Sequence, residues 1–68
     1  MPLPKEMLDG IKKRIDESED NLKSIEDVIS DLRATGTDAS KQQEALDKAK
    51  EELRRLRMFY ERQAARSA

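Results

Sequence analysis

The chain has 68 residues and a formal net charge of −1, with 43% charged residues, one Phe, one Tyr and neither Cys nor His. The lack of Cys excludes a disulfide framework, and the lack of His removes the commonest metal ligand. A chain of this length forms one small domain at most. Its near-neutral charge gives the whole molecule no strong attraction to nucleic acid or anionic lipid.

Residues 1–4 are expected to form a short arm, because Pro2 and Pro4 favour extended conformations in the residues that precede them. Pro4 also suits the first turn of a helix, so a first helix is predicted over residues 5–34. The arm has neither the basic nor the apolar segment of a secretory signal, and the chain has no run of 18 apolar residues. We therefore expect no membrane association and a cytoplasmic location.

Apolar residues recur in the first helix at alternating steps of three and four, as in a heptad repeat with apolar positions a and d. Ser18 is the break in this pattern. The pattern predicts a helix that packs along a partner helix. The core positions, a and d, are Leu8, Ile11, Ile15, Ser18, Leu22, Ile25, Ile29 and Leu32.

A turn is predicted at residues 35–37, where Gly36 can take the left-handed position that follows a helix. Thr37, Asp38 and Ser40 are all favourable N-cap residues, and Ser40 with Gln43 could form a capping box. We favour a start at Thr37 or Asp38 because it keeps the turn short. The second helix is therefore predicted over residues 38–66, antiparallel to the first.

The second helix repeats the same spacing, and folding the chain at Gly36 pairs its core positions with those of the first helix. One register fits every layer: Leu32 meets Ala39, Ile25 meets Leu46, and so on to Leu8 and Gln63. The predicted fold is all-α, an antiparallel two-helix coiled-coil hairpin. Polar residues at the core positions, Ser18, Gln42 and Gln63, are expected to set register or oligomeric state. The core positions of the second helix are Ala39, Gln42, Leu46, Ala49, Leu53, Leu56, Tyr60 and Gln63.

The two edges that flank the core positions differ in polarity. On the e edge, Lys12 is expected to face Arg57, Glu19 to face Lys50, and Glu26 to face Gln43. The g edge consists of the g positions of both helices, and four of its seven residues are apolar. Such a wide apolar stripe is typical of a four-helix bundle, and a lone hairpin without metal or disulfide has too small a core. We therefore predict a homodimer that docks through Met7, Val28, Ala45 and Phe59; the other g positions are Arg14, Asn21 and Glu52.

Two charged clusters are candidate sites. Residues 16–31 carry a net charge of −6, and the pairs Asp16/Asp20 and Asp27/Asp31 have the spacing of metal-binding carboxylates. Because these pairs lie outside the core positions and lack His, we interpret them as a solvated acidic face or a docking site for a basic partner, with no metal or cofactor. Residues 53–68 carry +4, which permits contact with nucleic acid but also simply complements the helix dipole. The possible nucleic-acid contacts are Arg54, Arg55, Arg57, Arg62 and Arg66.

No catalytic motif is present, so we do not expect an enzyme. The leading hypothesis is a non-enzymatic interaction or scaffold module that acts as a homodimer or binds another helical protein. One alternative is a small nucleic-acid-binding regulator that uses the arginine-rich end of the second helix. Another is a subunit or segment of a larger coiled-coil assembly, with the tip at residues 35–37 as the contact.

Overall fold

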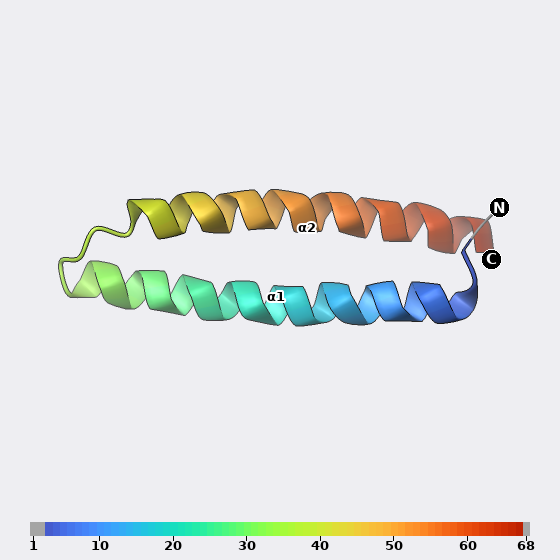
Figure 1. Ribbon diagram of the computed structural model, residues 1–68, viewed down its shortest axis with the longest axis horizontal. Coiled ribbons are helices and arrows are strands. Elements are labelled where there is room, and N and C mark those ends of the chain that lie inside the picture. Colours follow the sequence, from blue (N-terminus) through green and yellow to red (C-terminus); the bar gives the residue numbers. More distant parts are fainter. Residues whose placement is uncertain (1–2, 68) are drawn as a thin grey trace.

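The computed structural model describes residues 3–67, and these form two long helices joined by a turn (Figure 1). Helix α1 is Lys5–Ala34 and helix α2 is Ser40–Ser67. The helices run side by side in opposite directions, so that α1 begins where α2 ends. The rod measures 51 × 15 × 12 Å. The prediction of an all-α helical hairpin is confirmed; the Met1–Pro2 part of the expected arm lies outside the described residues.

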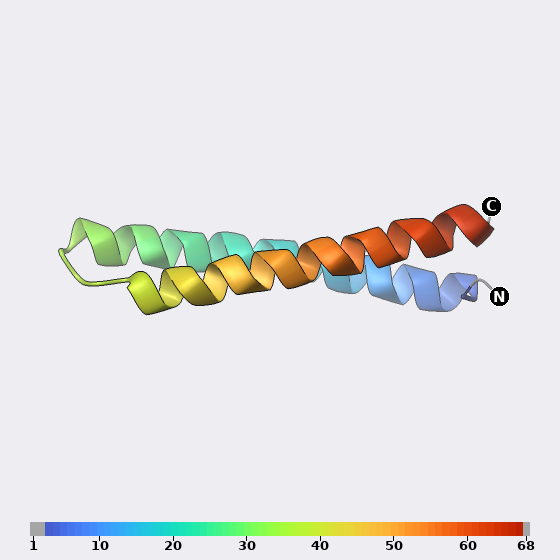
Figure 2. The same cartoon turned by 90° about the horizontal axis from the view of Figure 1, so that it is seen from above.

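Seen from above, the two helices are not parallel but cross each other along the rod (Figure 2). At the open end, the backbone N–H of Leu3 donates to Oε1 of Gln63, across 3.3 Å. This contact holds the start of the described chain against the last turns of α2. The two ends of the hairpin are therefore linked at the open end as well as through the turn.

The turn that ends α1 has the hydrogen bonds of a Schellman motif. The N–H of Thr37 donates to the carbonyl of Leu32 at 2.8 Å, and the N–H of Gly36 donates to the carbonyl of Arg33 at 3.0 Å. Gly36 has φ +78°, the left-handed conformation that a side chain disfavours. The role predicted for Gly36 is therefore the one it has in the structure.

Helix α2 begins two residues later than the predicted start at Asp38. Asp38 precedes the helix, and its Oδ1 accepts a hydrogen bond from the backbone N–H of Ser40 at 2.9 Å. The carbonyl of Ala39 accepts the bond from the N–H of Gln43, as an N-cap residue does. The connection is longer than predicted because Asp38 lies before the helix, where its carboxylate accepts the hydrogen bond from the otherwise unpaired N–H of Ser40. The same hydrogen bond lowers the pKa of Asp38.

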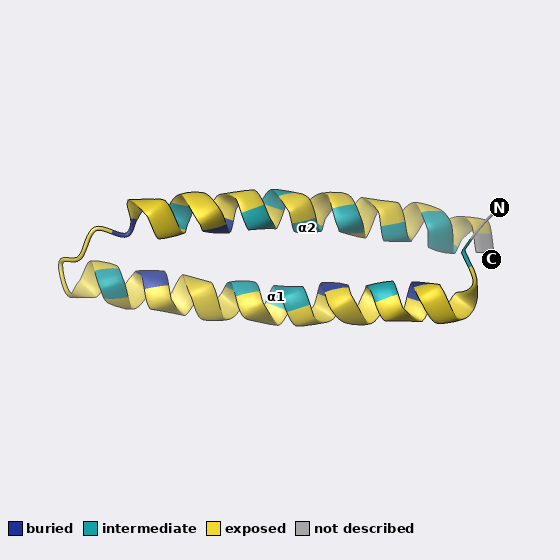
Figure 3. Ribbon diagram, viewed as in Figure 1, coloured by how far each residue is buried: buried dark blue, intermediate teal, exposed yellow. Residues whose placement is uncertain are grey.

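The core lies along the line where the helices face each other (Figure 3). Near the turn, Ile29, Ala39 and Leu46 form one buried cluster, with Leu22 and Leu32 packed against it. Farther along α1, Ile15 is 1% exposed. Among the residues whose burial the structure describes, the buried apolar ones are Leu8, Ile15, Ile29, Ala39 and Leu46, all at predicted core positions.

Two predicted core positions near the turn are not buried. Ile25 was expected to pack on Leu46 but is 40% exposed, and Gln42 is exposed. Gln43, one position further on, is partly buried and accepts a hydrogen bond from Arg33 at 3.0 Å. Ile25 and Gln42 both lie toward the g edge, whereas Gln43 lies on the e edge. Near the turn, the helices therefore contact each other through the e side, and the g side is left open.

The e edge is polar, as expected, but its partners are shifted by one heptad. Lys50 pairs with Glu26, not Glu19, with 2.8 Å between Nζ and Oε1. Arg57 forms an ion pair with Glu19 instead of facing Lys12. The expected pairs matched residues at equal height, whereas long side chains reach along the rod to oppositely charged or hydrogen-bonding groups one heptad away.

Candidate interaction surface

The g edge exposes three large apolar side chains to solvent. Met7 and Val28 of α1 are each 55% exposed, and Phe59 of α2 is 45% exposed. Ala45, the fourth residue of the predicted interface, is also exposed. The structure therefore places all four residues on the surface, Val28 and Ala45 toward the turn and Met7 and Phe59 toward the open end.

Ile25 extends the apolar surface at the turn end, and sequence reasoning missed it. Its d position predicted burial, yet it is 40% exposed one helical turn before Val28. The α2 residues on that side are the small Ala45 and Ala49, which cannot cover an isoleucine. The sequence contains the cause, because Ala45 and Ala49 on the g side of α2 are both small, but the heptad spacing alone does not reveal it.

The middle of the g edge is polar. Arg14 and Asn21 of α1 and Glu52 of α2 are exposed and lie between the two apolar ends. Within the described part of the chain, Arg14 and Glu52 form no ion pair, so their charges are left for solvent or for another molecule. Met58 is 50% exposed too, but it lies on the outer face of α2, away from the g edge.

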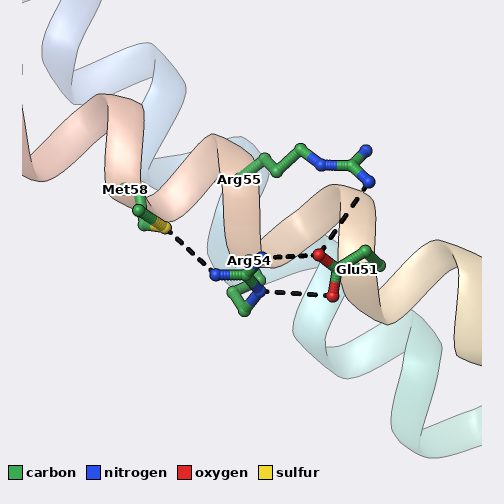
Figure 4. Close-up of polar contacts among 4 residues, drawn as sticks. All are labelled: Glu51, Arg54, Arg55 and Met58. Carbon is green, nitrogen blue, oxygen red and sulfur yellow. Dashed lines mark hydrogen bonds and ion pairs between the residues drawn. The ribbon is translucent and has the colours of Figure 1, made fainter.

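The arginines proposed to contact nucleic acid do not form one free cluster. Glu51 lies 2.5 Å from Nη2 of Arg54 and 3.8 Å from Nη2 of Arg55, and Arg54 also donates to the sulfur of Met58 at 3.3 Å (Figure 4). The hydrogen bond from Arg54 lowers the pKa of Glu51 and raises that of Arg54. With Arg57 paired to Glu19, three of the five guanidinium groups already have carboxylate partners.

The predicted acidic pairs do not assemble into a metal site. No group of three His, Cys, Asp or Glu residues able to hold a metal ion occurs among residues 3–67. Asp16 instead forms an ion pair with Lys12 on the surface of α1, with 2.9 Å between Oδ1 and Nζ.

A hollow of about 280 Å³ lies on the e edge near the turn, but its charged lining residues are already paired. Glu26 binds Lys50, and Arg33 donates to Gln43. The hollow is therefore the surface of the e-edge contacts and offers no converging free groups for a ligand. Its lining residues are Glu26, Ile29, Ser30, Arg33, Gln43, Leu46 and Lys50.

Neither helix in the described part of the chain is long and apolar enough to span a membrane. In comparisons with known proteins, the chain matches no family model, no curated protein and no solved structure at a significant level.

Proposed function

We propose that the protein is a non-enzymatic helical hairpin that acts by self-association through the g edge, as an interaction or scaffold module. The observation that carries this proposal is the exposure of Met7, Val28 and Phe59 on one edge, while the opposite edge is closed by polar contacts. Ile25 adds to the same surface. Burying apolar side chains that gather on one edge of a helical hairpin against a second hairpin stabilises the assembly.

A second hairpin would complete a four-helix bundle. Only five apolar residues are buried among those that the structure describes, which is a small core for two helices of 30 and 28 residues. Ordering so many residues costs more conformational entropy than so few buried side chains offset. Self-association would therefore stabilise the fold as well as serve the proposed function.

Sedimentation equilibrium and far-UV circular dichroism over a dilution series test the proposal. We expect a dimer at micromolar concentration, with helicity that falls as the dimer dissociates. Val28→Glu and Phe59→Glu should both produce monomers, because each places a charge in the apolar interface. Met58→Glu is the matched control, since Met58 is exposed to a similar degree but lies on the outer face. A stable, fully helical monomer at micromolar concentration contradicts the proposal.

Nucleic-acid binding is the second candidate, and the basic open end supports it. Its support is weaker, because Arg54, Arg55 and Arg57 are paired with carboxylates. Salt-sensitive retention on RNA or heparin that is lost in the triple variant R54Q/R55Q/R62Q would favour it. Equal elution of wild type and triple variant at low salt would exclude it.

A further inference from the structure

We infer that the two hairpins of the proposed dimer lie antiparallel, with the turn of one beside the open end of the other. A two-fold axis then crosses the middle of the rod. This inference rests on the proposed self-association and adds to it the orientation of the partner and the residues that meet. Two observations on the g edge show that such a two-fold axis fits the apolar pattern, and a third, on the charge distribution, selects this orientation.

The first observation is that the g positions of α1 read nearly the same in both directions. Met7 and Val28 are the apolar ends, and Arg14 and Asn21 are the polar middle. A two-fold axis between residues 17 and 18 therefore places Met7 on Val28 of the second copy and Arg14 on Asn21. In such an isologous contact the pairing of Met7 with Val28 occurs twice, once at each end, so that every apolar end is covered.

The second observation is that the g positions of α2 have the same symmetry. Ala45 and Phe59 are apolar and flank Glu52, which lies near the middle of α2. The two-fold axis places Phe59 over Ala45 of the second copy, a large side chain against a small one, as close packing requires. The centres of both rows lie near the middle of their helices, so one axis serves both.

The third observation is the separation of charge along the rod. Residues 16–52, which run around the turn, contain twelve acidic and five basic residues and carry a net charge of −7. The described segments that form the open end, residues 3–15 and 53–67, contain nine basic and three acidic residues and carry +6. An antiparallel dimer lays each acidic portion along a basic portion of the second copy.

A parallel dimer would do the opposite. It would place −7 beside −7 at the turns and +6 beside +6 at the open ends. Neighbouring helices in a bundle are about 10 Å apart, which is no more than a Debye length at moderate salt, so the repulsion would not be screened away. The apolar pattern permits either orientation, and the charge pattern decides between them.

One contact at the axis is unfavourable. Glu52 of one copy approaches Glu52 of the other, because this residue is the centre of the α2 row. The antiparallel arrangement therefore predicts that Glu52→Gln tightens the dimer. In a parallel dimer whose α1 packs beside α2 of the second copy, Glu52 would instead lie near the height of the uncharged Asn21, so Glu52→Gln would not tighten association.

Cysteine cross-linking tests the orientation, and the chain has no native Cys to interfere. Three single variants, M7C, V28C and A45C, are mixed in pairs under mild oxidation, so that every disulfide joins two chains. We expect M7C with V28C to cross-link roughly tenfold faster than V28C with A45C, because a disulfide needs Cα atoms within about 7 Å. Faster reaction of V28C with A45C, or of V28C with itself, overturns the antiparallel arrangement.

Sedimentation of the unmodified protein at two salt concentrations completes the test. The dissociation constant of an antiparallel dimer should rise about fivefold as salt rises from about 0.05 M to about 0.5 M, because attraction between the halves is screened. A constant that falls with salt indicates a parallel dimer and refutes the inference while the proposed function stands. Absence of any dimer refutes the proposed function itself, so the two failures are distinguishable.

Discussion

The ammonium group of Lys50 lies 2.8 Å from the carboxylate of Glu26 and joins the middle of α2 to α1 on the e edge. The same edge carries the ion pair between Glu19 and Arg57 and the hydrogen bond from Arg33 to Gln43. In α1 and in α2 the successive partners are seven residues apart. These contacts repeat once per heptad, and together they fix how the helices align along the rod.

Charge reversal tests this alignment. Lys50→Glu or Glu26→Lys alone should lower the melting temperature by a few degrees, because each places like charges opposite one another. The double variant K50E/E26K should recover most of the loss. Thermal unfolding at low salt, followed by circular dichroism, measures the cycle, and a double variant no more stable than either single variant contradicts the pairing. Because Glu26 raises the pKa of Lys50, the contribution of the pair is complete below the ordinary lysine pKa and is lost as pH rises through the raised value.

The two glycines should respond to alanine in opposite directions. Gly36 has φ +78°, so Gly36→Ala strains the turn and should destabilise the fold by about 1 kcal/mol. Gly10 lies inside α1, and a Cβ there meets nothing within 4 Å, so Gly10→Ala should stabilise by about 1 kcal/mol. A Cβ at Gly36 also meets nothing within 4 Å, so the difference between the variants isolates backbone conformation. Urea unfolding measures both, and equal effects would contradict the left-handed turn.

Asp38 should make the start of α2 sensitive to acid. The backbone N–H of Ser40 holds the pKa of Asp38 below its usual value, so the carboxylate stabilises the helix start above the ordinary Asp pKa. That contribution is lost as pH falls through the lowered pKa. Asp38→Ala should lower the melting temperature by a few degrees at neutral pH but have little effect at strongly acid pH. A difference between the two proteins that does not shrink on acidification would rule out this role.

The sequence predicted most of the hairpin because several local signals agree. The heptad spacing gave the helix pairing, and Gly36 gave the end of α1. It could not predict the start of α2, because three N-cap residues competed within four positions and Asp38 acts from outside the helix. The heptad spacing alone misplaced Ile25, because it assigns every d residue to the core, whereas burial also depends on the size of the flanking residues, here Ala45 and Ala49. The exposed apolar side chains of the g edge could be predicted, because Val28 and Phe59 are apolar at positions where a lone hairpin would have charged residues.

Ser18 is a polar residue at a core position and is partly buried. Ser18→Leu should extend the apolar core between Ile15 and Leu22 and stabilise the fold by about 1 kcal/mol, which raises the melting temperature by about 5 °C. Ser24→Leu is the control, because Ser24 is exposed on the outer face of α1 and a leucine there gains no burial. A lower melting temperature for Ser18→Leu would show that the position has no room for a larger side chain and would contradict its place in the core.

Ile15 and Ile25 offer the sharpest comparison, because both occupy core positions but only one is covered within the hairpin. Ile15 is 1% exposed, so Ile15→Ala should cost about 3 kcal/mol at every protein concentration. Ile25 is 40% exposed, so Ile25→Ala should cost clearly less in dilute solution. If the g edge is the dimer interface, the cost of Ile25→Ala should grow at high protein concentration, where a second hairpin covers the side chain. Urea unfolding of both variants at two concentrations decides the matter: a cost for Ile25→Ala that does not change with concentration would place Ile25 outside the interface.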